Sequence, residues 1–237
     1  MSDFDLNHAF DKEPGPDPAL IERISGRVAT GLTPVRPLPP RWVLAAGMIV
    51  LVLAVALAGA AYFGIYGIQE LTAGQAAAIF TVLAILLGAA AVASVAGMIP
   101  GSRRVLRGWP LAASVCAALA ATFAAVFRDY SMDDFVPEGM VCFEAGLLVA
   151  IPAAALVWLV LRRGFTLDRP QSGASAGALG GLAGVLMLEL HCPNLALPHV
   201  AVWHVAVIPA SALAGWLVGA IVPRRNGESG ARRGENL

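Results

Sequence analysis

Six long apolar stretches run through this chain of 237 residues, and they constrain its fold more than any other feature. They cover Trp42–Tyr66, Gln75–Ile99, Gly108–Phe127, Gly139–Leu161, Gly173–Leu190 and Val200–Val222. Each stretch is close to the ~20 residues that a helix needs to cross ~30 Å of hydrocarbon. The sequence therefore predicts an all-α, polytopic membrane protein, built as a bundle of six transmembrane helices. The composition agrees with a membrane protein, since 58% of the residues are hydrophobic and only 14% are charged.

Basic residues follow alternate connections between these stretches. Of the sixteen Lys and Arg residues, fifteen lie in the N-terminal segment, the second and fourth connections or the C-terminal tail, and only Arg128 lies in an odd-numbered connection. Because basic residues stay on the cytoplasmic side during insertion, we expect both termini to be cytoplasmic. The same arginines are expected to anchor the protein to the lipid bilayer and not to contact nucleic acid directly.

This topology divides the chain into three parts. We predict a cytoplasmic N-terminal segment over 1–41, a six-helix transmembrane domain over 42–222 and a cytoplasmic C-terminal tail over 223–237. Residues 1–16 of the N-terminal segment are polar and acidic, and we expect them to form a disordered leader.

Residues 17–32 predict an amphipathic helix, which a proline-rich spacer separates from the first stretch. Asp17 suits the N-cap and Pro18 the first helical position. Apolar residues that share one helical face form a stripe: Leu20, Ile21, Ile24, Val28 and Leu32. Such a stripe can lie on the bilayer surface, against the protein's own loops or in the groove of a partner protein.

Glycines of the fifth stretch recur at helix-packing spacing. They are Gly173, Gly177 and Gly181, with Gly180 and Gly184 alongside. Small residues four apart let two helices approach closely within a membrane. We therefore predict that these glycines form ridges against which other helices pack. Those helices can belong to the same chain or to a second copy of it, so a homodimer is possible.

Cysteines and histidines gather at the predicted extracytoplasmic end of the bundle. They are Cys142, near the start of the fourth stretch, and His191, Cys192, His199 and His204 in and after the fifth connection. Cysteine and histidine side chains ligate ions such as Zn²⁺ or Cu⁺, while two thiols in an oxidising compartment can pair. Alternatively, these residues have only a structural role: the histidines form hydrogen bonds with lipid headgroups and loop carbonyls, and the cysteines pack against neighbouring side chains.

Two carboxylates on the stretches extend the candidate metal set. Glu144 and Glu189 both lie near outer ends of their stretches, where interfacial water reaches them. A carboxylate within a membrane is a functional candidate because its burial is costly. The possible cofactor is thus a transition-metal ion of unknown identity, and none is required by the sequence.

No catalytic template is evident in the sequence. It has no His-Glu-x-x-His helix and no Ser/Lys pair within the stretches. We therefore expect a protein that is not an enzyme. The rival classes are a small multi-pass metal-ion transporter or channel, with the carboxylates and the His/Cys group at its mouth, and a membrane redox enzyme.

Five short motifs occur in order along the chain. They are Leu32-Thr-Pro-Val-Arg-Pro-Leu-Pro-Pro-Arg-Trp42, Pro100-Gly-Ser-Arg-Arg104, Cys142 ahead of Pro152, Leu161-Arg-Arg-Gly164, and His191-Cys-Pro followed by Trp203-His204. Together they resemble the NrsF-type integral membrane anti-sigma factors, a bacterial family with six spans and a short cytoplasmic N-terminus. The resemblance covers roughly residues 17–223, although the acidic leader is longer than the family pattern.

The resemblance implies a function and a location. It implies that the N-terminal segment sequesters an extracytoplasmic-function sigma factor at the bacterial inner membrane. It also implies that extracytoplasmic cysteines, here Cys142 and Cys192, influence the response to metal or oxidant stress. The stripe on residues 17–32 is then expected to be the docking element for the sigma factor.

Overall fold

The computed structural model describes residues 17–31, 39–98, 106, 108–162 and 168–222. The chain divides into two compact units, 1–38 and 39–237. Several predictions lie outside the described residues: the disordered leader, the end of the apolar stripe at Leu32, most of the proline-rich spacer and the C-terminal tail.

Helix α2 (Pro18–Gly31) is the described part of the first unit and begins at the predicted residue. The Asp17 carboxylate accepts a hydrogen bond from the Ala19 backbone N–H at 2.9 Å, which caps the first turn as predicted. The described members of the apolar stripe are each between 43% and 56% exposed: Leu20, Ile21, Ile24 and Val28. Helix α2 therefore presents its apolar side chains at its surface.

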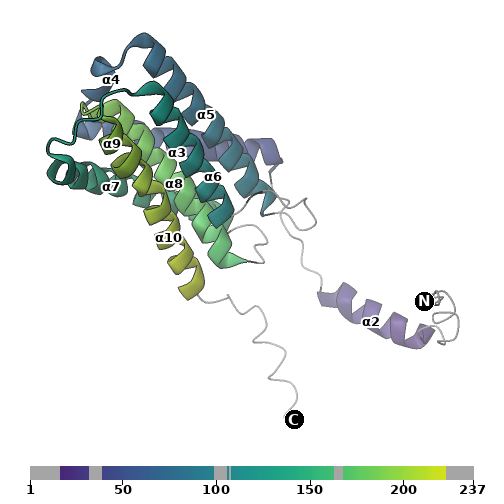
Figure 1. Ribbon diagram of the computed structural model, residues 1–237. Coiled ribbons are helices and arrows are strands. Elements are labelled where there is room, and N and C mark those ends of the chain that lie inside the picture. The colour runs from purple at the N-terminus through teal and green to yellow at the C-terminus, as the bar shows by residue number, and fades with distance from the viewer. Residues whose placement is uncertain (1–16, 32–38, 99–105, 107, 163–167, 223–237) are drawn as a thin grey trace, which may run out of the picture. The chain divides into compact units, whose positions relative to one another are not determined.

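The second unit contains six helical segments long and apolar enough to cross a membrane (Figure 1). They are α3 (Arg41–Phe63), α5 (Ala73–Ala96), α6 (Trp109–Val126), α7 (Phe135–Leu161), α8 (Arg169–His191) and a last run of α9 (Leu197–His199), the π-helical η1 (Val200–His204) and α10 (Val205–Ile221). The described residues include no strand. These observations confirm the predicted all-helical fold with six helical segments long and apolar enough to span a membrane, while the orientation of the termini stays a prediction.

The helix bounds differ from the predicted stretches by a few residues. Helices α7 and α8 each begin four residues before the predicted stretch, because polar residues such as Glu138 and Gln171 continue the helix beyond its apolar part. A short helix that the sequence did not predict, α4 (Gly67–Glu70), follows α3. These differences change the lengths of the helices but not the number or order of the six long apolar segments.

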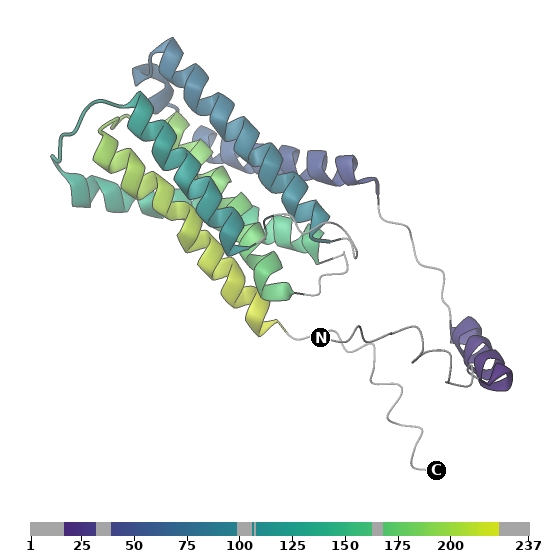
Figure 2. The ribbon, with the colours of Figure 1, turned by 45° about the vertical axis from the view of Figure 1, so that its right-hand side comes forward.

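Helix α8 lies at the centre of the bundle, with the other long helices around it (Figures 1 and 2). Of its most apolar window, 89% is buried, against 28–39% for the other five segments. Those five segments therefore leave most of their surface uncovered by the rest of the protein, whereas α8 is enclosed by it.

The predicted glycine ridges explain how α8 fits at the centre. The ridge against α10 consists of Gly173, Gly177 and Gly181, and the ridge against α7 consists of Gly180 and Gly184. A Cβ added at Gly177 would overlap the carbonyl oxygen of Ser211 on α10. Both ridges are thus occupied by helices of the same chain, and a homodimer, which stays a prediction, would need another surface.

The two ends of the bundle differ in charge among the described residues. Arg41, Arg162 and Arg169 lie at the end where α3 and α8 begin. There the Arg169 guanidinium donates a hydrogen bond of 3.2 Å to the carbonyl of Val222, just after α10, where a cation is favourable. The opposite end carries one arginine, Arg128, and five of the eight acidic residues described in the bundle: Glu70, Asp129, Asp133, Asp134 and Glu138. This separation gives the bundle two chemically distinct faces.

Candidate metal and thiol site

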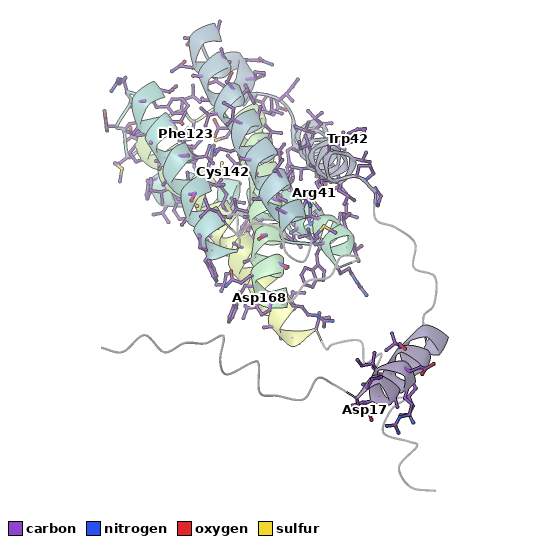
Figure 3. All side chains as sticks on the ribbon, turned by 90° about the vertical axis from the view of Figure 1, so that its right-hand side faces the viewer. Asp17, Arg41, Trp42, Phe123, Cys142 and Asp168 are labelled. Atoms are coloured by element: carbon purple, nitrogen blue, oxygen red, sulfur yellow. The ribbon has the colours of Figure 1, made fainter. Side chains whose placement is uncertain are left out.

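Four side chains with metal-ligating atoms meet at the acidic end of the bundle. They are Cys142, Cys192, His199 and His204, and one donor atom from each lies within 4.8 Å of the others. Cys142 is half-buried, and the other three are buried. Figure 3 shows Cys142 among the helices, towards the end opposite to Asp168. We call these four residues the thiol–imidazole cluster.

The two cysteines come from different helices. Cys142 lies on α7, about two turns after its start, and Cys192 is the C-cap of α8. The Cys192 backbone N–H still donates to the carbonyl of Leu188 at 2.7 Å, and Pro193 then ends the helix. A Cβ added at Gly67 of α4 would overlap the Cys192 carbonyl oxygen, so α4 covers this turn closely.

The two histidines come from one helical run that is π-helical between them. His199 ends α9 and His204 ends η1. At about 100° per residue, an α-helix would place residues five apart on different faces. A π-helical turn, with its i→i+5 hydrogen bonds, brings such residues onto one face. The two rings accordingly lie edge to face, with centroids 5.3 Å apart.

This π-helical turn was not predicted from the sequence, although one local feature of the sequence favours it. Pro209 lies inside α10 and has no N–H to donate to the carbonyl of Val205, where the π-helical turn meets α10. Irregular turns in helices commonly occur next to such a proline. The signal was weak, because a proline alone does not say which irregularity will form.

The thiols are free and close to each other. Cys142 Sγ and Cys192 Sγ are 3.3 Å apart, and Cys192 Sγ lies 3.4 Å from His199 Nε2. The hydrogen bond with Cys142 and then burial raise the pKa of the Cys192 thiol, while the imidazoles of His199 and His204 act in the opposite direction. Cys192 is therefore protonated at neutral pH, and a metal ion or an oxidant would have to displace that proton.

Glu189 lies beside the cluster and not in it. Its Oε1 is 2.7 Å from His204 Nδ1, and both side chains are buried. The sequence had suggested that interfacial water reaches Glu189. The structure corrects this, since the helical run that carries His204 covers the carboxylate. The other ring nitrogen of His204, Nε2, is buried and has no hydrogen-bond partner among the described residues.

Two further members of the predicted metal set lie outside the cluster. His191 Nδ1 is 3.1 Å from the carbonyl oxygen of Gly64, and its ring packs against Phe63 and Tyr66. Glu144 is exposed on α7. The structure thus brings together Cys142, Cys192, His199 and His204, places Glu189 behind His204, and leaves His191 and Glu144 apart.

Contacts outside the cluster fix its geometry. Asn194 Nδ2 donates to Glu138 Oε2 at 2.7 Å, which ties the loop after α8 to the start of α7. The indole of Trp203 lies so close to Gly139 that a Cβ there would overlap it. Because Gly139 is one turn before Cys142, this contact sets the position of that thiol relative to the histidines. Neither contact was predictable from the sequence.

The cluster suits two kinds of chemistry. Two sulfur and two imidazole nitrogen donors form a set that holds tetrahedral ions such as Zn²⁺. The two thiols would instead need to approach by only about 1.2 Å to reach the length of a disulfide bond. The residues present therefore fit either metal capture or reversible thiol oxidation.

The fold and the cluster define a class of protein: a six-span helical membrane protein with a buried thiol–imidazole cluster at one end of the bundle and an amphipathic helix in a separate N-terminal unit. A family model described as "Negative regulator of sigma F" (NrsF) matches residues 28–224. The chain belongs to this family, which confirms the predicted resemblance. Its name denotes an anti-sigma factor, and so implies a sigma-factor partner.

The family match begins within α2, at Val28, so most of the apolar stripe precedes the matched region. The cluster lies entirely within that region. Comparisons with curated proteins and with solved structures gave no significant match.

Proposed function

We propose that this chain is an anti-sigma factor of the bacterial inner membrane that holds an extracytoplasmic-function sigma factor through α2 and releases it on metal or oxidant stress. The observation that carries the proposal is the family match over residues 28–224. The proposal assigns the chain no enzymatic activity and no direct contact with nucleic acid. Its role in transcription is exerted through the sequestered partner.

The proposed orientation places both termini in the cytoplasm and the cluster outside. It is supported by the arginines, which gather on the connections and termini at one end of the bundle. In this orientation α2 meets cytoplasmic proteins, and the thiol–imidazole cluster meets the compartment in which metals and oxidants first arrive.

Helix α2 is the proposed docking element for the sigma factor. Its exposed stripe has the spacing by which amphipathic helices fill apolar grooves, with Leu20, Ile24 and Val28 four residues apart. Occupation of a surface that the sigma factor needs for RNA polymerase would be sufficient for sequestration.

The proposed signal acts on the cluster in one of two ways. A metal ion would bind the two sulfur and two nitrogen donors and displace the thiol protons. An oxidant such as hydrogen peroxide would join Cys142 Sγ to Cys192 Sγ. Two S–H bonds and the O–O bond break, two electrons pass from the thiols to the peroxide, and two water molecules form.

Helix α8 is the proposed route from the signal to the cytoplasmic side. It carries Glu189 and Cys192 at one end and Arg169 at the other, and its glycine ridges pack it against α7 and α10 along its length. A signal changes partner binding only if the two states of the protein differ in affinity for the partner. A hundredfold release corresponds to a difference of about 2.7 kcal/mol.

A metal transporter is not the function that the geometry favours. Transport needs ligands along a path, whereas the cluster of four potential ligands found among the described residues lies at one end of the bundle. Glu144, which the rival interpretation places at a channel mouth, is exposed on α7 and apart from the cluster.

Capture and release from membranes tests the proposal. Membrane vesicles that contain the full chain should retain a sigma factor, which can be identified by mass spectrometry and by its transfer to core RNA polymerase. Added Zn²⁺ or hydrogen peroxide should release it. Failure to retain any sigma factor would contradict the anti-sigma function. If the vesicles retained a sigma factor but neither Zn²⁺ nor hydrogen peroxide released it, only the proposed signal would be contradicted.

A further inference from the structure

We infer that Glu189 is a positioning residue for a four-ligand metal site, in which it holds His204 so that Nε2 joins Cys142, Cys192 and His199 as a ligand. This inference rests on the metal branch of the proposed function. It adds a residue outside the ligand set and assigns that residue a measurable effect on metal affinity.

The contact between Glu189 and His204 fixes the orientation of the imidazole. The 2.7 Å contact with Glu189 Oε1 engages His204 Nδ1, so the carboxylate oxygen accepts a hydrogen bond from an Nδ1–H and leaves Nε2 turned away from it. In neutral imidazole the other nitrogen then carries a lone pair, which is the form that ligates metals. Glu189 therefore selects both the direction of the ring and the nitrogen available to a ligand.

The available nitrogen lacks a partner within the protein. His204 is 1% exposed, and its Nε2 has no hydrogen-bond partner among the described residues. Buried polar atoms are rarely left in this state, because the hydrogen bonds lost with water are not replaced. A metal ion held among the four donor atoms of the cluster would occupy this nitrogen.

The second histidine of the cluster has no such support. His199 Nε2 faces Cys192 Sγ at 3.4 Å, while its Nδ1 is buried and has no partner among the described residues. The carboxylate thus acts on one of the two imidazoles. This asymmetry makes the contribution of Glu189 separable, because it should vanish when His204 is removed and persist when His199 is removed.

Glu189 and Cys192 lie three residues apart at the same end of α8, so that one helix end supplies both a ligand and the support of another ligand. Helix α8 is also the most enclosed helix of the bundle. Carboxylates that orient metal-bound histidines typically change metal affinity 10–100-fold when they are replaced. We expect a change of this size from Glu189→Gln, which keeps the shape and an acceptor oxygen but removes the charge.

The experiment measures Zn²⁺ affinity of the reduced, full-length protein in detergent by competition with a chromophoric chelator. Co²⁺, which replaces Zn²⁺ in tetrahedral sites, gives visible absorption that reports the ligand geometry. The variants are Glu189→Gln, His204→Ala and the double variant. Glu144→Gln is the matched control, since Glu144 is an exposed carboxylate on α7 outside the cluster.

Glu189→Gln should bind Zn²⁺ about 10–100-fold more weakly and change the Co²⁺ spectrum, whereas Glu144→Gln should do neither. In the His204→Ala background, Glu189→Gln should cause no further loss, because a positioning residue acts only through its ligand. A merely structural role would lower affinity equally in both backgrounds. Thermal unfolding of the metal-free protein checks that each variant is folded, and Glu189→Asp, which keeps the charge, should retain more affinity than Glu189→Gln.

Two outcomes would overturn the inference. Wild-type affinity in Glu189→Gln, or an equal loss with and without His204, would show that the carboxylate does not position the ligand. If Cys192→Ser still abolished Zn²⁺ binding in that case, the metal branch of the proposed function would stand without Glu189. A wild-type protein that bound neither Zn²⁺ nor Co²⁺ would overturn the inference and remove the metal branch, while leaving thiol oxidation intact.

Discussion

Helix α2 and the thiol–imidazole cluster differ in the burial of their distinctive side chains. The cluster buries its histidines and places each donor atom near the others, so that the chain itself completes most of the site. Helix α2 exposes apolar side chains such as Ile24, which is 54% exposed. Apolar side chains on one helical face gain stability only when another surface covers them. The cluster is thus organised to receive a small ligand, and α2 to receive a macromolecule or a membrane.

This difference implies that the two regions can be altered separately. A change in α2 should alter partner capture and leave metal binding unchanged. A change in the cluster should alter the response to a signal and leave capture at rest unchanged. Each of the following predictions tests that separation, beginning with the largest expected effect.

The double substitution Leu20→Asp/Ile24→Asp should weaken sigma-factor capture by about a hundredfold or more, because burying a carboxylate in an apolar groove is costly. Co-purification from membranes measures the effect. Gly26→Asp is the control: it adds a negative charge on the opposite face of α2, where an added Cβ meets no atom within 4 Å. Equal recovery from wild type and the double variant would refute α2 as the docking element, and a loss of Zn²⁺ affinity would break the separation.

Cys192→Ser should abolish peroxide-induced release and leave capture at rest unchanged. A serine hydroxyl cannot form the disulfide and is a poor ligand for ions that prefer thiolates. Release of the sigma factor from treated vesicles is the measurement. Cys116→Ser is the matched control, since Cys116 is a half-buried cysteine on α6 outside the cluster. Normal release by Cys192→Ser would remove the cluster from the sensing role.

Gly177→Ala should lower the free energy of unfolding of the bundle by about 1–3 kcal/mol, because the added Cβ would overlap the Ser211 carbonyl oxygen and push α8 from α10. Thermal unfolding in detergent measures this loss. Gly88→Ala on α5 is the control, since its Cβ would meet nothing within 4 Å. Capture at rest should survive Gly177→Ala in the folded fraction. Its complete loss there would show that α2 depends on the packing of the bundle.

His191→Ala should leave Zn²⁺ affinity unchanged, which is the smallest effect expected here. The ring of His191 contacts the carbonyl of Gly64 and lies apart from the cluster. His199→Ala, by contrast, removes one of the four donor atoms and should weaken binding. Chelator competition on both variants compares them directly. A loss in His191→Ala as large as that in His199→Ala would show that the metal-bound geometry differs from the cluster described.

Much of the architecture could be predicted from the sequence, because the bilayer imposes it. A helix that crosses hydrocarbon must be long and apolar, and this requirement is visible in the sequence whatever the neighbouring helices do. The glycines of α8 also signalled close packing in advance. The sequence did not predict which helix would pack against each ridge. Glycines such as Gly177 and Gly180 permit close packing against any helix that presents small side chains.

The candidate site was predictable in part. The sequence located its cysteines and histidines at one end of the bundle through topology alone. It could not separate His204 from His191, because both lie near the same end of the bundle, on the connection between the fifth and sixth segments or next to it. That distinction depends on the π-helical turn, which places His204 on the same face as His199 and against Glu189.

The sequence by itself determined that six helices are long and apolar enough to cross a membrane, that basic residues gather on alternate connections, and that an amphipathic helix precedes the first of the six. Each of these is a local property, set by hydropathy, charge and periodicity within one segment. Only the tertiary structure decided which donor atoms meet and which carboxylate supports them. Residues 142 and 192 are fifty positions apart, and their sulfur atoms come within 3.3 Å only because α8 packs against α7.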